Sequence, residues 1–224
     1  MQKLIITLVL VASIAPVKAK DVAGRANVID GDTIAVEGVE SRIRLHGIDA
    51  PEGKQICDDD HGRHYLCGTR SADALSNLIG RNGTVSCTET GRDRYGRIIA
   101  ICHSHGREIN REMVRLGWAA DFRRYSNDMY ATEEKEAQSA KRGLWAGQFV
   151  LPWEWRKGKR LTSEQGGGTS RECSIKGNIS SAGAVYHIPG SIDYARTVID
   201  ESRGERWFCS EEEAKAAGWR PPRG

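Results

Sequence analysis

Beyond its first nineteen residues, the sequence has no apolar run long enough to cross a membrane. It also has no internal repeat, which argues against a solenoid or propeller. A strong charge of one sign is missing too: the formal net charge is +3 over 224 residues. The chain as a whole therefore lacks the field of a strongly basic nucleic-acid binder. Any attraction to phosphate must come from local clusters, such as the four basic side chains within residues 156–160.

The first nineteen residues have the pattern of an export signal. Lys3 supplies the positive start, residues 4–14 are apolar, and residues 17–19 form a small-residue exit. The apolar run is shorter than the roughly 20 residues that span a bilayer, which argues against a membrane anchor. No cysteine stands at the exit for lipid attachment. We therefore expect a signal peptide over residues 1–19 and a secreted or periplasmic monomer that leaves the membrane after cleavage.

Six cysteines in an exported chain predict disulfides. Local spacing favours three pairs: Cys57–Cys67, Cys87–Cys102 and Cys173–Cys209. A zinc site is the alternative for the first pair, because Cys57, His61, His64 and Cys67 have ligand types and spacings that zinc uses. In an oxidising compartment a disulfide is the favoured use of the two cysteines.

The apolar patterning predicts a small barrel with helices packed on it. Alternation and helical spacing indicate the following elements: strands within 22–46, a helix over 69–79, strands over 85–89 and 98–102, and helices over 107–116 and 132–142. A few strands, a helix, two more strands and then helices fit a mostly antiparallel barrel. We expect this domain to extend over residues 22–149.

The remainder of the chain reads as a linker followed by a small unit. Residues 150–170 are expected to be a basic, glycine-rich linker, because residues 156–170 show no apolar periodicity and include three consecutive glycines. Residues 171–224 form the small unit. Its last helix has a capping box at Ser210 and Glu213 and a stop at Gly218. With only two cysteines, we expect a disulfide-stapled accessory domain without a metal.

The stretch 28–52 carries the chemistry. A tight hairpin brings its two ends together, so Asp32 becomes a neighbour of the corner that holds Asp49 and Glu52. Carboxylates a few ångströms apart repel one another unless a cation joins them. Arg44 lies on a strand between them in sequence. The stretch therefore predicts a site for a hard metal ion with an anion clamp beside it.

A second arginine comes from a distant turn. Arg97 ends the turn over residues 91–97, which contains two glycines. Two arginines facing a metal suit a phosphodiester, because they neutralise the charge that develops on a pentacoordinate phosphorane. The pattern thus favours phosphodiester hydrolysis.

Several motifs resemble the staphylococcal nuclease (thermonuclease) family. They are VIDGDT, RIRLHGIDAPE, DRYGR, REINREMVRLGWA and KRGLW, and the likeness spans about residues 22–149. The resemblance implies an α+β, mostly β fold: an OB-fold barrel of five strands with three packed helices. It also implies a Ca²⁺-dependent endonuclease that cuts DNA and RNA and leaves 3′-phosphates.

The resemblance implies roles for individual residues. Asp32 and Asp49 match the calcium ligands, with the backbone carbonyl of Ala50 beside them. Glu52 matches the carboxylate that activates the attacking water. Arg44 and Arg97 match the arginines on the scissile phosphate. Three further residues match positions near the nucleotide: Arg94, Tyr95 and Tyr125.

Departures from the family pattern leave alternatives open. Arg123 stands where the family has a second tyrosine near the nucleotide. The acidic run 58–60 could bind additional Ca²⁺, although a solvated loop is favoured. His46 could tune the pH dependence, although a place on the barrel or its rim is favoured. The alternative function is a non-catalytic, exported OB-fold protein that binds nucleic acid, but a complete set of site residues favours catalysis.

Overall fold

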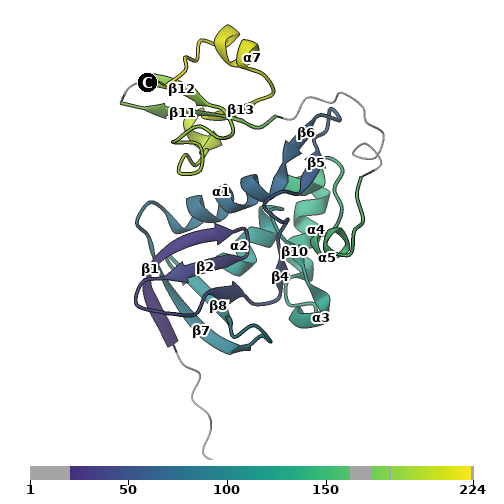
Figure 1. The fold of residues 1–224 in the computed structure, drawn as a ribbon. Helices are drawn as coiled ribbons and strands as arrows, with labels where there is room; N and C mark the ends of the chain where they lie inside the picture. Colours follow the sequence, from purple (N-terminus) through teal and green to yellow (C-terminus); the bar gives the residue numbers. More distant parts are fainter. Residues whose placement is uncertain (1–20, 162–172, 182, 223–224) are drawn as a thin grey trace, which may run out of the picture.

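The structure is a computed structural model, and it describes residues 21–161, 173–181 and 183–222 (Figure 1). The predicted signal peptide and the glycine-rich end of the predicted linker lie outside the described residues. Among the residues that are described, no helix has both the length and the apolar character needed to cross a membrane.

A closed barrel of five strands forms the main body, which confirms the predicted fold class. The strands are β1 (Asp21–Asp30), β2 (Thr33–Val36), β3 (Ile43–Leu45), β7 (Thr84–Arg92) and β8 (Ile98–Ser104). They pair antiparallel in the order β3-β2-β1-β7-β8, and a parallel pairing of β3 with β8 closes the barrel. Short β9 (Arg107–Glu108) extends the sheet beyond β8.

Three longer helices cover the barrel: α1 (Cys67–Ile79), α2 (Ile109–Arg115) and α4 (Ala131–Ser139). Each was predicted to within a few residues, except that α2 starts at Ile109 because residues 107 and 108 pair with β8 as β9. Apolar side chains of α1 and α2 meet those of the strands in one core, in which Ile34, Leu45, Leu75 and Met113 are at most 1% exposed. Burial of this apolar face is the main force that holds helices of this length in place.

Short elements fix the corner where the barrel ends. β4 (Ile48–Asp49) pairs with β10 (Ala120–Asp121), and β5 (Ile56–Asp58) pairs with β6 (His64–Leu66). Two short helical elements, α3 (Arg123–Ser126) and the 3₁₀ turn η1 (Gly143–Ala146), follow β10 and α4. The β4–β10 pairing joins residues 48–49, which carry part of the predicted site, to the segment that carries Tyr125.

The predicted linker differs from the structure in its first part. Residues Pro152–Arg156 form the helix α5, with proline at the start where a missing N–H costs nothing. Trp153 of this helix stacks on Phe122, with ring centroids 5.0 Å apart and planes within 5°. The helix is therefore held by packing against the barrel domain, and a segment so short has no room for the periodicity that sequence patterns reveal.

The C-terminal unit is a three-stranded sheet with one helix. Its strands are β11 (Ile175–Ser180), β12 (Gly183–His187) and β13 (Arg206–Phe208), in the order β12-β11-β13, and the short 3₁₀ turn η2 (Glu201–Arg203) precedes β13. Helix α7 (Glu211–Ala216) starts at Ser210, whose hydroxyl accepts a hydrogen bond from the Glu213 N–H at 3.1 Å, as the capping box predicts. A core of Ile175, Tyr186, Phe208, Ala214 and Trp219 closes the unit.

The C-terminal unit docks on helix α1 through polar contacts. The Ile199 N–H donates to Asp73 at 3.3 Å, and Asn77 donates to the Ile199 carbonyl at 3.0 Å. Lys176 lies 3.6 Å from Asp73, and both side chains are buried. Burial raises the pKa of Asp73 to about 6 and lowers the pKa of Lys176. The pair is thus a buried ion pair between two parts of the chain.

The three predicted disulfides are present: Cys57–Cys67, Cys87–Cys102 and Cys173–Cys209. Cys87 and Cys102 face each other across β7 and β8. Because Cys57 and Cys67 are bonded to each other, their sulfurs are not free to hold zinc, and the alternative zinc site is wrong. His64 instead pairs with Asp58.

Candidate active site

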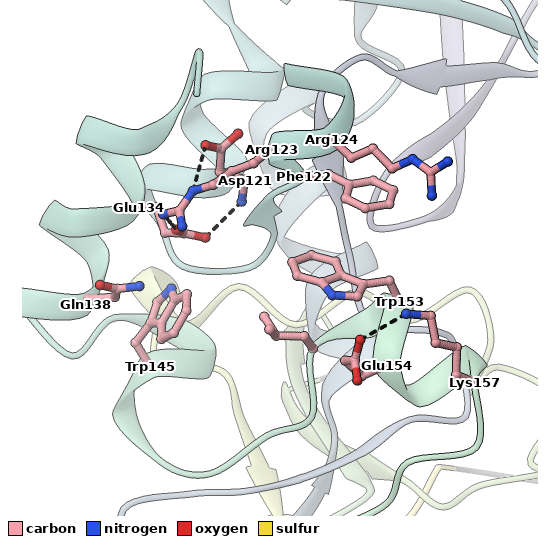
Figure 2. A pocket seen from close by; sticks show the side chains of 11 residues that line it. Asp121, Phe122, Arg123, Arg124, Glu134, Gln138, Trp145, Trp153, Glu154 and Lys157 are labelled. Atoms are coloured by element: carbon pink, nitrogen blue, oxygen red, sulfur yellow. Dashed lines mark hydrogen bonds and ion pairs between the residues drawn. The ribbon is translucent and has the colours of Figure 1, made fainter. Parts of the chain in front are cut away.

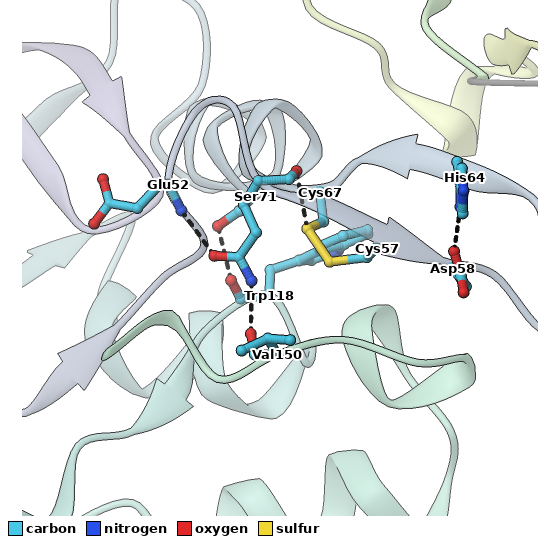
Figure 3. Close-up of a disulfide and its surroundings, with 9 residues drawn as sticks. Glu52, Cys57, Asp58, His64, Cys67, Ser71, Trp118 and Val150 are labelled. Carbon is cyan, nitrogen blue, oxygen red and sulfur yellow. Dashed lines mark hydrogen bonds and ion pairs between the residues drawn. A yellow bond between two sulfur atoms is a disulfide. The ribbon is translucent and has the colours of Figure 1, made fainter. Parts of the chain in front are cut away.

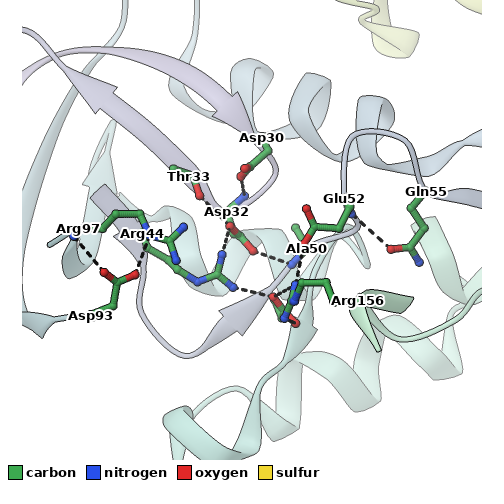
Figure 4. A network of polar contacts seen from close by, with 11 residues as sticks. Asp30, Asp32, Thr33, Arg44, Ala50, Glu52, Gln55, Asp93, Arg97 and Arg156 are labelled. Atoms are coloured by element: carbon green, nitrogen blue, oxygen red, sulfur yellow. Dashed lines mark hydrogen bonds and ion pairs between the residues drawn. The ribbon is translucent and has the colours of Figure 1, made fainter. Parts of the chain in front are cut away.

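Two buried aspartates share one arginine at the centre of the site (Figure 4). Asp32 ends the turn between β1 and β2, and Asp49 lies in β4; their exposed fractions are 3% and 0%. Arg44 of β3 donates to Asp32 at 2.5 Å through Nη1 and to Asp49 at 2.6 Å through Nη2. The two ends of the predicted hairpin therefore meet, and the strand arginine bridges them.

The turn that carries Asp32 is held from several sides. The Ala50 N–H donates to Asp32 Oδ2 at 2.9 Å, and the Thr33 hydroxyl donates to Oδ1 at 2.9 Å. A side chain at Gly31 would place its Cβ 1.9 Å from the Ser71 hydroxyl oxygen, so only glycine allows helix α1 to approach this closely. The carboxylate of Asp32 is consequently fixed before any ligand arrives.

Asp30 is a residue of this turn that the sequence analysis missed. Its Oδ1 accepts from the Asp32 N–H at 3.1 Å. Burial, and then the charge of Asp32, raise the pKa of Asp30 to about 6. A second aspartate two residues before a ligand is a usable signal, because an aspartate side chain often accepts from the N–H two residues further on.

Gln55 holds the backbone at Glu52 and was also missed. Its N–H donates to the Glu52 carbonyl at 2.7 Å, and its side-chain oxygen accepts from the Glu52 N–H at 3.3 Å. Its side-chain nitrogen donates to the Val150 carbonyl at 2.6 Å, and the residue is fully buried. The Glu52 corner is therefore fastened to the segment after the barrel domain, while its carboxylate stays 38% exposed.

The Cys57–Cys67 disulfide lies to one side of this corner (Figure 3). Cys67 begins α1, and its N–H donates to the Gln55 carbonyl at 3.1 Å. Gly68 follows it, and a Cβ there would lie 1.9 Å from the Glu52 carbonyl oxygen. Helix α1, the disulfide and the Glu52 corner are thus in direct backbone contact.

Arg156 is the residue of the site that the sequence analysis placed in a linker. From α5 it donates to Asp49 Oδ2 at 2.7 Å through Nη2, and to Glu52 Oε1 at 2.8 Å and Asp49 Oδ1 at 3.1 Å through Nη1. Although burial lowers it, the hydrogen bonds to Asp49 and Glu52 raise the pKa of Arg156 above its ordinary value. A proline followed by two tryptophans and an arginine was the available signal for a docked helix.

The site balances three carboxylates against two guanidinium groups. Burial raises the pKa of Asp49, and the hydrogen bond from Arg156 lowers it in part. Burial lowers the pKa of Arg44, but the charges of Asp32 and Asp49 raise it by more, so the pKa lies above its ordinary value. A nearby cation and hydrogen bonds to its oxygens both favour the ionised form of a buried carboxylate. Asp32 and Asp49 supply the oxygen ligands that Ca²⁺ prefers, so the residues present fit that ion.

Arg97 lies at the rim, near Arg44 (Figure 4). It donates to Asp93 at 2.7 Å through Nε and at 3.0 Å through its backbone N–H, which fixes the turn over residues 93–97. Its side chain is 30% exposed. Tyr95 at the tip of this turn is 70% exposed, and Arg94 donates to its hydroxyl at 2.6 Å. The turn thus presents two arginines and an aromatic ring to solvent.

Comparison with known proteins gives the family. The family model described as staphylococcal nuclease homologue matches residues 42–147. The succinoglycan biosynthesis protein ExoI of Rhizobium meliloti (strain 1021) is 38% identical over 131 residues, which cover 58% of this chain and 68% of that protein. An uncharacterized endonuclease of Escherichia coli is 41% identical over 150 residues, which cover 64% of this chain and 91% of that protein. The chain belongs to the staphylococcal nuclease family.

A plant relative extends the comparison. The probable staphylococcal-like nuclease CAN4 of Oryza sativa subsp. japonica is 40% identical over 123 residues, which cover 54% of this chain and 23% of that protein. The range matched by the family model contains Arg44, Asp49, Glu52 and Arg97, whereas Asp32 and Arg156 lie before and after it. Arg156 therefore lies outside the part of the chain that the family model describes.

Tyr125 lies beside an aromatic stack in this member of the nuclease family. It is 57% exposed and meets Phe122 edge to face at 4.9 Å. A cavity of about 480 Å³ is lined by Phe122, Trp145, Leu151 and Trp153 together with charged side chains (Figure 2). Arg123 donates to Glu134 of α4 at 2.8 Å, so it is turned to α4.

Two further residues raised by the sequence have clear places in the nuclease. His46 accepts or donates at 3.0 Å with the Thr90 hydroxyl, and burial lowers its pKa. The imidazole is therefore held against β7 and is harder to protonate than a free one. Asp59 of the acidic run accepts from the backbone of His61 and Arg63 at 2.9 Å each, so it organises its own loop.

Proposed function

We propose that this protein is a Ca²⁺-dependent endonuclease that hydrolyses the phosphodiester bonds of DNA and RNA and leaves 3′-phosphate ends. One observation carries the proposal: Asp32, Asp49 and Glu52 converge around Arg44 and Arg156 at hydrogen-bonding distances. Membership of the staphylococcal nuclease family and relatives named as endonucleases support it.

The residues divide the reaction among them. Asp32, Asp49 and the carbonyl of Ala50 would hold Ca²⁺, which supplies positive charge to a non-bridging phosphate oxygen when bound. Glu52 is the most exposed of the three carboxylates. It takes a proton from the attacking water while the oxygen of that water bonds to phosphorus. The bond from phosphorus to O5′ breaks, the leaving O5′ takes a proton from solvent water, and the phosphate stays on the 3′ side.

Arginines stabilise the charge that develops on the phosphoryl oxygens. Arg44 and Arg97 are the proposed donors, and a positioned charged donor is worth about 3 kcal/mol or more in the transition state. Arg94 and Tyr95 on the neighbouring turn, and Tyr125 across the site, are the proposed contacts to flanking nucleotides. Exposed aromatic rings stack on any base, which suits an enzyme that accepts both DNA and RNA.

We further propose the cellular setting and the domain organisation. Three disulfides support an oxidising compartment, in agreement with a signal peptide over residues 1–19 and a secreted or periplasmic monomer. The nuclease domain would span residues 22–149 and the accessory domain residues 171–224. Helix α5 belongs with the nuclease domain because it packs on it.

The test is nicking of a supercoiled plasmid in Ca²⁺ and in chelator, with wild type, Glu52→Gln and the exposed-carboxylate control Glu40→Gln. We expect cleavage only in Ca²⁺, a loss of about 10²–10⁴-fold in Glu52→Gln, and no loss in Glu40→Gln. Glu52→Gln should still be stabilised against heat by Ca²⁺. Nucleic-acid binding without cleavage by the wild type in Ca²⁺ would instead support the alternative, a non-catalytic binding protein.

A further inference from the structure

Arg156 occupies the solvent side of the carboxylate cluster. Arg44 reaches Asp32 and Asp49 from the barrel, and its side chain is 19% exposed. Arg156 reaches Asp49 and Glu52 from α5, and its side chain is 38% exposed, as is that of Glu52. The buried carboxylate of Asp49 therefore accepts hydrogen bonds from two guanidinium groups, one on a barrel strand and one on α5.

The hydrogen bonds of Arg156 use the oxygens that a cation would need. Asp49 Oδ1 accepts from both Arg44 and Arg156, and Asp49 Oδ2 accepts from Arg156. Each carboxylate oxygen has only two lone pairs, so both of those on Asp49 Oδ1 are used and Oδ2 keeps one. Ca²⁺ bonds directly to carboxylate oxygens and repels a guanidinium held at the same atoms. Full occupancy by Arg156 and coordination of a divalent cation are therefore in conflict.

We propose that Arg156 is a further residue of the active site and that it competes with the divalent cation for Asp49 and Glu52. In the metal-free protein it closes the site as a built-in cation, and it leaves these carboxylates when the metal binds. The inference rests on the proposed metal site of Asp32 and Asp49. It assigns to Arg156, which reaches Asp49 and Glu52 from the solvent side, a control over metal affinity.

The position of α5 makes such a movement local. The helix has five residues, and its packing contact is made by Trp153 at its first turn, whereas Arg156 is at its last position. Lys157 pairs with Glu154 of the same helix, and Arg160 lies over Trp155, 4.1 Å from the ring centroid. The Arg156 side chain can therefore swing outward while the helix stays docked through its aromatic residues.

Calorimetric titration of Ca²⁺ into the metal-free full chain tests the proposal, without substrate. The variants are Arg156→Met, Arg156→Lys and the control Lys159→Met, which removes an exposed positive charge three positions along the chain. If the site is closed by Arg156 for about nine-tenths of the time, Arg156→Met binds Ca²⁺ about tenfold more tightly. Lys159→Met should change the affinity by less than about twofold, because exposed charges at a distance are screened.

Arg156→Lys keeps the charge but loses the two-pronged contact, so a smaller gain of about threefold is expected. This variant also decides the matter if Arg156→Met does not fold, which circular dichroism would reveal. Equal affinities in wild type and both Arg156 variants, or weaker binding in the variants, would overturn the competition and leave the metal site standing. Absence of Ca²⁺ binding in all proteins, including wild type, would overturn the proposed metal site together with this inference.

Discussion

Arg44 is the residue on which the charge balance of the site depends. Its two hydrogen bonds neutralise Asp32 and Asp49, which are 3% and 0% exposed. Without it, two buried carboxylates face each other with Arg156 as their nearest cation. Leaving a buried charge without its partner is far more costly than losing a surface ion pair.

Arg44→Met should therefore destabilise the metal-free protein by about 3 kcal/mol. The measurement is urea unfolding in chelator, compared with Arg42→Met, an exposed arginine two positions earlier. Added Ca²⁺ should restore more stability to Arg44→Met than to wild type, because the ion replaces the missing charge. Equal destabilisation of the two variants would show that the buried pair contributes nothing special.

His46 predicts a pH dependence of stability. Burial lowers its pKa in the folded state below the ordinary value of about 6.5. Between the two pKa values the unfolded chain binds a proton that the folded protein does not. The free energy of unfolding is therefore unaffected by His46 above pH about 6.5 and falls as the pH drops below that value.

His46→Gln should remove part of this acid-side slope. Unfolding free energies measured from about pH 5 to pH 7.5 would reveal it, with the exposed His103→Gln as the matched control. An unchanged slope in His46→Gln would contradict the assignment.

At the scale of elements, helix α1 and the Glu52 corner depend on their close approach at Gly68. A Cβ at this position would lie 1.9 Å from the Glu52 carbonyl oxygen and 2.4 Å from its carbon, which are backbone atoms that cannot rotate away. The helix start and the corner must therefore separate if Gly68 is replaced.

Gly68→Ala should cost about 1–3 kcal/mol of stability and reduce Ca²⁺-dependent cleavage by displacing Glu52. Gly53→Ala is the control, since a Cβ there meets no atom within 4 Å. Both variants would be measured by thermal unfolding and by plasmid nicking. Wild-type activity in Gly68→Ala would mean that the corner accommodates the methyl group without moving Glu52.

Sequence patterns predicted the helices and strands in which the spacing of apolar residues repeats several times. The barrel strands alternate, and α1 repeats its apolar side chains over several turns, so both were expected at nearly their observed places. Helix α5 was not, because five residues hold barely one turn and its position depends on Trp153 meeting Phe122. That contact joins segments about thirty residues apart and leaves no local trace.

The same contrast between local patterns and long-range packing decides which site residues could be predicted. Asp32, Arg44 and Asp49 lie within one stretch, and the pairing of β2 with β3 helps to bring them together. Arg156 comes from a distant part of the chain. Gln55 acts through a buried hydrogen bond to the Val150 carbonyl, and the identity of neither residue predicts this bond. Short-range geometry could thus be inferred, whereas contacts made by tertiary packing could not.

At the scale of the whole molecule, the buried pair of Lys176 and Asp73 joins the C-terminal unit to α1. Burial raises the pKa of Asp73 to about 6 even with Lys176 3.6 Å away. The unit therefore holds its place through an interaction in which the loss of hydration offsets much of the attraction between the charges.

Lys176→Met should destabilise the protein by about 3 kcal/mol, because it leaves Asp73 buried without a cation. The double variant with Asp73→Asn should recover part of this loss. Lys215→Met, which removes the exposed partner of Glu211 in the same unit, is the control and should change stability by about 0–1 kcal/mol. Additive effects of the Lys176 and Asp73 substitutions in denaturant unfolding would show that the two side chains are uncoupled.

The contacts of the site differ greatly in the number of residues that separate the two partners along the chain. Arg44 and Asp49 are 5 positions apart, and Arg44 and Asp32 are 12 apart, whereas Arg156 and Asp49 are 107 apart. Closing a longer loop costs more chain entropy, so the contact of Arg156 is expected to form after the barrel has brought the other residues together. The carboxylate cluster is therefore expected to assemble during refolding with Arg44 as its single arginine. Divalent cations should accelerate this assembly, because they offset the repulsion among the carboxylates before Arg156 arrives.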